Sequence, residues 1–305
     1  MNLLEAIEEI RAEFADVNSP AGTRDFAELE RVFGALPDQA LILYRDHNGS
    51  FSIPQIRERR LAARLMPIQE VIRMRAAMIA LGHYLPAIGP VAWLWTDDNS
   101  NYCGIYTDGP LRGWLCILDH EEPMLTPAFR SIASFITRLF TEVRQKDRGG
   151  AYDLPSVPRD VPETVPHVED DELDQKLALY FREQHRNESD EAMRRLYAFC
   201  SICLTPFEHT SEVIPFLEDQ DMWVPEAAVR LLEIRQWDAG TEQLEKLARE
   251  GRPNGDYAAM RLLARMKTDD SQQAIARLNR YLQGQKLKTL EMWTRPGIRL
   301  QPPSW

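Results

Sequence analysis

The chain has 305 residues, of which 44% are hydrophobic and 27% are charged, and its formal net charge is −11 at pH 7. This acidic balance argues against nucleic-acid binding, because such proteins gain most of their affinity by neutralising phosphates with a basic face. No stretch approaches the ~18 consecutive apolar residues that cross a bilayer, and the first residues lack the basic and apolar regions of a secretory signal. We therefore expect a cytoplasmic protein that contacts no membrane.

Helical patterns dominate the first part of the chain. Apolar residues at helical spacing predict four helices, at about residues 3–15, 24–33, 35–46 and 68–79. Thr23 is suited to the N-cap of the second helix and Pro37 to the first turn of the third. His47-Asn48-Gly49 ends the third helix, and Phe51-Ser52-Ile53 is a candidate short strand.

The stretch Ala92–Glu122 gives the clearest sheet signal. Three short runs of aromatic and branched residues are separated by polar turns at Asp97–Asn101 and Asp108–Pro110. This pattern predicts a three-stranded antiparallel meander. Trp93 and Trp95 would then point to the same face of their strand, because side chains alternate along a strand.

Thr126-Pro127 is expected to open an amphipathic helix that closes the first half of the chain. The second half has a different character. Prolines then recur without apolar periodicity, which favours an extended linker. We divide the chain into a first domain over residues 1–146, a proline-rich linker over 147–170, a helical domain over 171–294 and a tail over 295–305.

An internal repeat marks the helical domain. Ala227–Leu232 recurs as Ala258–Leu263, an offset of 31 residues (258 − 227). The offset predicts three helix pairs, over Arg194–Asp219, Pro225–Glu250 and Asp256–Leu282. Two helices per unit at this period resemble short HEAT-like repeats.

Residues 26–143 carry an ordered set of features that resembles the SUKH superfamily, also called the SMI1/KNR4 family. In chain order the matching residues are Leu36-Pro37, Tyr44, Asn48-Gly49, Asp97–Tyr102, Gly109–Leu111, Leu118–Glu122 and Phe129–Phe135. The resemblance implies an α+β fold with an antiparallel or mixed sheet flanked by helices. It also implies a binding module rather than an enzyme, since bacterial members look like immunity proteins that bind and neutralise toxin domains. The Trp-rich strand before the acidic turn departs from the usual pattern.

The candidate binding residues are the polar residues at the turns of the meander and two aromatic rings beside them. They are Asp97, Asp98, Asn99, Asp108, Asp119, Glu121, Glu122, Trp93 and Trp95. The functional interpretation is an electronegative surface for a basic toxin face. The alternatives are ordinary turn chemistry for the acidic residues and core packing for the two rings.

Other motifs give little support for catalysis. Asp97-x-Asn99-x-Asn101 only faintly resembles a calcium loop, because Tyr102 stands where such a loop needs Gly. Cys200-Ser201-Ile202-Cys203 lies in a helical stretch without a second cysteine pair, which favours buried structural thiols. The arginines between Arg57 and Arg75 form either a phosphate-binding strip or a solvated helix face. The sequence holds no nucleotide-binding loop, nucleophile elbow or metal-spaced histidine pair, so we expect no enzyme, cofactor or metal.

Together these observations predict a cytoplasmic immunity protein that binds a cognate toxin with a basic face and occludes its active site. The helical repeats would offer a second grip on the same partner. The alternative is a scaffold or regulatory protein-binding module in cell-envelope or stress physiology. A HEAT-type nucleic-acid binder is the third class, and the glutamates interleaved with basic residues in the repeats disfavour it. The oligomeric state and the toxin's chemistry stay open.

Overall fold

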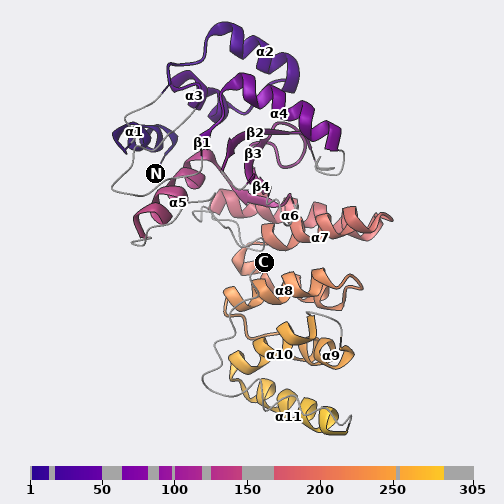
Figure 1. The fold of residues 1–305 in the computed structure, drawn as a ribbon. Helices are drawn as coiled ribbons and strands as arrows, with labels where there is room; N and C mark the ends of the chain where they lie inside the picture. Colours follow the sequence, from indigo (N-terminus) through magenta and orange to yellow (C-terminus); the bar gives the residue numbers. More distant parts are fainter. Residues whose placement is uncertain are drawn as a thin grey trace. The chain divides into compact units, whose positions relative to one another are not determined.

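The computed structural model describes residues 2–13, 18–49, 64–81, 89–97, 100–118, 125–145, 168–251 and 255–284. The chain divides into two compact units, Met1–Pro166 and His167–Trp305 (Figure 1). The candidate strand at Phe51-Ser52-Ile53, most of the predicted linker and the predicted tail lie outside the described residues. Among the described helices, none combines the length and the apolar character that a membrane crossing requires.

The first unit is a five-stranded antiparallel sheet with helices packed on it. Its elements are α1 (Leu3–Glu13), α2 (Thr23–Phe33), α3 (Asp38–Asp46), β1 (Arg64–Leu65), α4 (Ile68–Leu81), β2 (Val91–Thr96), β3 (Tyr102–Tyr106), β4 (Leu115–Leu118), β5 (Pro127–Phe129) and α5 (Ile132–Gln145). The strands lie in sequence order, β1-β2-β3-β4-β5, and every neighbouring pair is antiparallel. The predicted meander is confirmed as β2, β3 and β4, and the α+β class is confirmed with it.

One predicted helix start is wrong. Thr126-Pro127 does not open a helix, because Pro127–Phe129 forms the edge strand β5 beside β4 and α5 begins only at Ile132. Proline lacks a backbone N–H and is tolerated at a sheet edge, where that donor is not needed. The start of α5 is instead fixed by Gln39, whose Oε1 accepts the Ile132 N–H at 2.7 Å.

Two smaller differences concern helix caps. Gly22, not Thr23, is the N-cap of α2, and its N–H donates to the Asp25 side chain at 3.0 Å. Pro37 is the N-cap of α3 rather than a residue of its first turn. Such one-residue shifts at helix ends leave the predicted elements unchanged.

A β-bulge in β2 sends Trp93 and Trp95 to opposite faces of the sheet. Trp93 pairs with Gly104 and Trp95 pairs with Cys103. Between these two pairs, β2 advances by two residues while β3 advances by only one. Residues directly opposite each other share a face, and neighbours along a strand do not. The prediction that both rings point the same way is therefore wrong, because the inserted Leu94 breaks the alternation.

Both faces of β2 are covered. Every residue of the strand is buried, and α4 packs against it, with α2 packed on α4 (Figure 1). On the face that Trp95 shares with Cys103, the Trp95 ring lies 4.7 Å from the ring of Phe135 in α5. Full burial of a large apolar side chain stabilises a fold by roughly 1.5–3 kcal/mol, so this aromatic core holds the sheet and α5 together.

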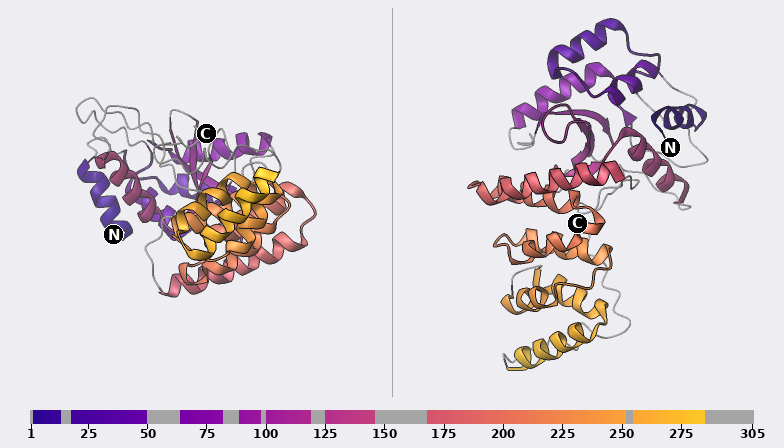
Figure 2. Two further views of the ribbon diagram at one scale, coloured as in Figure 1. Left: turned by 90° about the horizontal axis from the view of Figure 1, so that it is seen from below. Right: turned by 180° about the vertical axis from the view of Figure 1, so that it is seen from behind.

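The second unit is a stack of helices, as Figure 2 shows from two further directions. Its elements are α6 (Val168–Asn187), α7 (Glu191–Leu204), the 3₁₀-helix η1 (Phe207–Glu218), α8 (Trp223–Ile234), α9 (Thr241–Glu250), α10 (Gly255–Met266) and α11 (Asp269–Gly284). The three predicted helix pairs are confirmed as α7 with η1, α8 with α9, and α10 with α11. The helix α6 precedes them and packs on α7. It begins at Val168, so the last three residues of the predicted linker are helical.

The 31-residue repeat is visible in the backbone as well as in the sequence. Gln236 follows α8 and Lys267 follows α10, and each adopts the left-handed conformation with φ of 53°. Their spacing is again 31 residues (267 − 236). The alanine pairs at Ala227-Ala228 and Ala258-Ala259 are buried in α8 and α10. Those two helices pack on each other, and small side chains at such a contact let the backbones approach closely.

Candidate functional site

Trp93 and Trp95 belong to the core of the first unit. Each side chain is only 1% exposed. The edge of Tyr102 packs on Trp93 with ring centroids 6.2 Å apart, and Trp95 packs on Phe135. Neither ring can reach a partner in this conformation. Their inclusion among the binding residues is therefore corrected, and the core-packing alternative holds for both.

Asp97 serves its own turn. Its carboxylate accepts the Asn101 backbone N–H at 2.9 Å and the Asn101 side-chain amide at 2.9 Å. The residue is 7% exposed. Ser100, within the same turn, has a positive φ of 63°. Asp97 therefore follows the turn-chemistry alternative, because Asp side chains often bond the backbone of their own turn.

A binding residue has to be exposed, and Asp108 is the exposed one of the two predicted acidic residues that the structure describes. It lies with Gly109 and Pro110 at the exposed tip of the loop between β3 and β4. That loop is held at its base, where Gly113 N–H donates to Tyr106 O at 2.9 Å. The remaining members of the predicted surface, Asp98, Asn99, Asp119, Glu121 and Glu122, lie outside the described residues.

Three residues that carry the family resemblance form one joint beside the sheet. The Tyr44 hydroxyl donates to Met66 O at 2.8 Å, and Asn48 Oδ1 accepts the first N–H of α4 at 2.9 Å. Gly49 has a φ of +95°, and a Cβ there would lie 2.8 Å from the Pro67 ring. The motif thus ties the end of α3 to the start of α4.

The basic run before α4 is partly neutralised. Arg64 donates to Glu70 at 2.8 Å and forms a two-point ion pair with it. The hydrogen bond from Arg64 holds the pKa of the Glu70 carboxyl below its usual value. Arg64 lies in the strand β1, so it is not part of a helix face, and its pairing with Glu70 weighs against a phosphate-binding role. Arg57, Arg59 and Arg60 lie outside the described residues.

The cysteines are structural. All four are buried and none forms a disulfide, which confirms the burial predicted for Cys200 and Cys203. Burial raises the pKa of the Cys103 thiol well above its usual value and that of Cys116 to about 12. A thiol that stays protonated is a poor nucleophile and a poor metal ligand. Within the described residues, no group of three or more His, Cys, Asp or Glu side chains could hold a metal ion.

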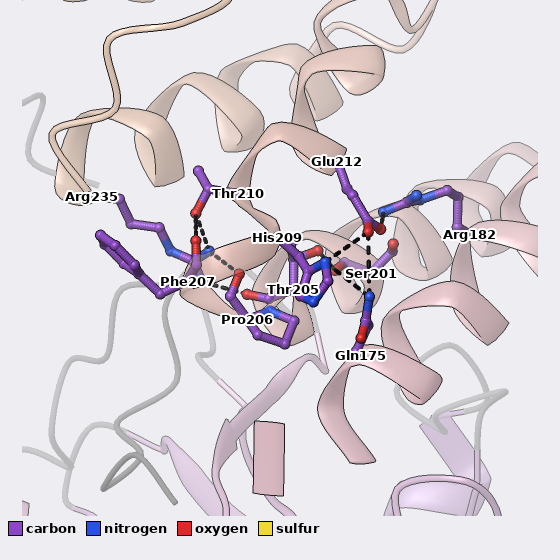
Figure 3. Close-up of polar contacts among 10 residues, drawn as sticks. All are labelled: Gln175, Arg182, Ser201, Thr205, Pro206, Phe207, His209, Thr210, Glu212 and Arg235. Carbon is purple, nitrogen blue, oxygen red and sulfur yellow. Dashed lines mark hydrogen bonds and ion pairs between the residues drawn. The ribbon is translucent and has the colours of Figure 1, made fainter. Parts of the chain in front are cut away.

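The second unit holds a polar cluster where α6 meets η1 (Figure 3). His209 Nδ1 lies 2.9 Å from Gln175 Nε2 and 3.1 Å from Glu212 Oε1. Arg182 pairs with the other oxygen of Glu212 at 2.9 Å. A neutral His209 can accept from Gln175 through Nδ1, and a protonated one can donate to Glu212. The hydroxyl of the buried Ser201 donates to the Ala178 carbonyl. The contacts of the cluster tie α6 to η1.

Arg235 closes the junction between α7 and η1. Its guanidinium donates to Pro206 O at 2.9 Å, to Thr210 Oγ1 at 2.8 Å and to Thr205 O at 2.5 Å (Figure 3). These acceptors are uncharged, and burial lowers the pKa of Arg235 to about 10. Carbonyls near a helix C-terminus lack donors within their own helix, and Arg235, the residue after α8, donates to those that follow α7.

Phe207 is the most exposed aromatic side chain among the described residues, at 56%. The Arg235 guanidinium lies 6.0 Å from the centre of its ring, and Trp237 meets the ring edge-on at 6.3 Å. The ring is therefore held in position by neighbours on α8 and the loop after it. Sequence analysis missed this group, because Phe207 and Trp237 are separated along the chain and no local pattern joins them.

His185 joins three elements through both of its ring nitrogens. Its Nε2 lies 2.8 Å from Asp219 Oδ2, and its Nδ1 lies 2.9 Å from Arg194 O. Both partners are acceptors, so the arrangement suits the imidazolium form of the ring, in which both nitrogens donate. Burial disfavours this cation, but the bonds to Asp219 and to the Arg194 carbonyl outweigh burial and leave the pKa of His185 raised.

No protein-family model and no curated protein matches this sequence. Function therefore has to be argued from the arrangement of the residues themselves. The described clusters join helices to one another, and the exposed groups at Asp108 and Phe207 are suited to contact another protein.

Proposed function

We propose that this chain is an immunity-type protein that acts in the cytoplasm and neutralises a toxin by covering its active site. The observation that carries the proposal is the joint of Tyr44, Asn48 and Gly49 with the start of α4. Tyr44, Asn48 and Gly49, which match the SUKH pattern within residues 44–49, together hold the start of α4. Because these residues act together in the fold, they support the resemblance to the SUKH family more strongly than unconnected matches would.

The kind of surface on each unit supports a binding role. In the first unit, the exposed turn at Asp108-Gly109-Pro110 projects from a sheet whose faces are buried. In the second, stacked helix pairs present an extended surface, which repeat proteins use to bind other proteins. Two units on one chain would gain affinity for a single partner through effective concentration.

Charge supports a basic partner. The chain carries a formal net charge of −11, and complementary charge speeds the encounter of two proteins. Many arginines of the second unit are paired within it. Arg277 donates to Glu245 at 2.7 Å, and Arg261 donates to Glu233 at 2.7 Å. These pairs reduce the basic character that a nucleic-acid binder would need.

The proposal is tested with the toxin encoded beside this gene. The full chain and the toxin domain are co-expressed, co-purified and assayed for toxin activity. We expect a stable complex and loss of the toxin's activity. Absence of both binding and protection would refute the proposal, and a growth defect on deletion without any toxin would favour the scaffold alternative.

A charge-reversal pair then locates the contact. Asp108→Lys is expected to slow association several-fold and to weaken its salt dependence, because a rim charge acts mainly on the association rate. Glu30→Lys makes the same charge change on the exposed side of α2 and is the matched control. Equal rates for the two variants would move the contact away from the β3–β4 turn. Asp97 is unsuitable for this test, since its reversal would disrupt the turn it holds.

A further inference from the structure

An exposed apolar patch lies where η1 begins and α8 ends. The rings of Phe207 and Trp237 pack on each other there, and Ile234 stands three residues before Trp237 in the chain. We call these three residues the aromatic edge. Phe207 is 56% exposed and Ile234 is 45% exposed, while Trp237 is half-buried beside them. Single open apolar side chains are ordinary on a protein surface, but apolar side chains that gather in one place mark interaction sites.

The helical repeat does not require this patch. One repeat further along, the positions 31 residues on are Asp238 for Phe207, Arg265 for Ile234 and Thr268 for Trp237. Phe207 begins η1, whereas Asp238 lies in the loop before α9. The ends of α8 and α10 share a left-handed residue, Gln236 and Lys267, and the second end carries polar Arg265 and Thr268. The helix end can therefore be built with polar residues at the positions of Ile234 and Trp237.

The aromatic edge is preorganised for contact. Arg235 is fixed by its bonds to Pro206 and Thr210 and lies over the Phe207 ring, as Figure 3 shows. Trp237 supports the same ring from its edge. A side chain already held in one position loses little conformational entropy on binding, so its burial contributes more fully to affinity. Aromatic residues of this kind dominate the energetics of protein interfaces.

The charges beside the patch indicate the partner's chemistry. Glu208 follows Phe207 in the chain, Asp238 follows Trp237, and both are exposed. Arg235, which lies at the patch, is occupied by uncharged acceptors of its own unit. An apolar centre with carboxylates at its rim is complementary to an apolar side chain set among lysines or arginines.

We propose that the aromatic edge is a contact surface for a basic protein partner, which places an apolar side chain against Phe207 between Glu208 and Asp238. The proposal rests on the proposed function in so far as the neighbouring toxin is the first partner to be tested. It names the second unit as the part of the chain that supplies the central contact.

The test compares variants of the full chain. Phe207→Ala is expected to weaken toxin binding at least about tenfold, and Ile234→Ser is expected to weaken it in the same direction. Glu208→Lys with Asp238→Lys is expected to slow association. Leu179→Ala is the matched control, since Leu179 is an equally open apolar residue of the same unit, at 45% exposed. Unchanged thermal unfolding of each variant shows that the fold is kept.

The outcomes separate the two proposals. If the toxin binds the wild-type chain and Phe207→Ala equally well, the aromatic edge is refuted and the immunity function stands. If the toxin does not bind at all, the immunity function fails, and the surface is probed with a short synthetic peptide that carries one leucine among lysines. The surface is supported if the peptide shifts the NMR signal of the Trp237 indole N–H in the wild-type chain. The shift should be absent in Phe207→Ala, and it should also be absent when the leucine is flanked by glutamates. A wild-type signal that does not shift refutes the surface.

Discussion

Replacing Gly104 with alanine probes the centre of the sheet. Gly104 lies opposite Trp93, and a Cβ at this position would stand 2.7 Å from Trp93 Cε3 and closer still to Val91 Cγ1. Both neighbours are buried in β2, so neither can swing away into solvent. Overpacking of a core costs about 1–3 kcal/mol, and two rigid contacts on one added methyl place this substitution near ~3 kcal/mol.

Scanning calorimetry of the full chain measures the effect. The expected loss lowers the unfolding temperature of the first unit by about 3 °C per kcal/mol, or about 9 °C in all. The transition of the second unit should not move, because Gly104 belongs to the first. Tryptophan fluorescence provides a second readout, since Trp93 itself must shift to admit the methyl group.

Gly22→Ala is the matched control. Gly22 has an ordinary φ of −79°, and a Cβ there would meet only Asp25 Oδ2, at 3.5 Å. The control should cost less than about 1 kcal/mol, which is the size of an N-cap effect. If Gly104→Ala unfolds at the temperature of the control, the Trp93 ring does not cover Gly104 and the bulged register of β2 is wrong.

Two further predictions concern the second unit. Arg235→Met should lower its free energy of unfolding by about 3 kcal/mol in a denaturant titration, because unpaired buried acceptors cost roughly 1–3 kcal/mol each; a loss below about 1 kcal/mol would contradict the three-point contact. The imidazolium of His185, which faces Asp219 and Arg194, should stabilise the unit fully below the ordinary pKa of 6.5 and lose that effect as pH rises through its raised pKa. The lowered pKa of Asp219 adds stability that is present above 3.8 and lost as pH falls through the folded value, although burial alone would raise that pKa. The free energy of unfolding of the wild type should therefore decline between about pH 6 and about pH 9, and that of His185→Gln should not. Parallel curves for the two proteins would contradict the charged ring.

The sequence by itself determined the local elements. Aromatic runs with polar turns predicted β2, β3 and β4, because alternation and turn chemistry act over a few neighbouring residues. The 31-residue offset predicted three helix pairs, since a repeated apolar pattern imposes a repeated helix contact. The buried state of Cys200 and Cys203 followed from the same local helical pattern.

Only the tertiary structure decided which faces and partners those elements have. The bulge at Leu94 turned Trp93 and Trp95 to opposite faces, and the cost of an extra residue is set by pairing with β3 rather than by β2 alone. The acceptors of Arg235 lie 25 to 30 residues away along the chain, so no local pattern marks it. Exposure of Phe207 and burial of Asp97 likewise depend on what packs nearby, and that is a property of the folded chain.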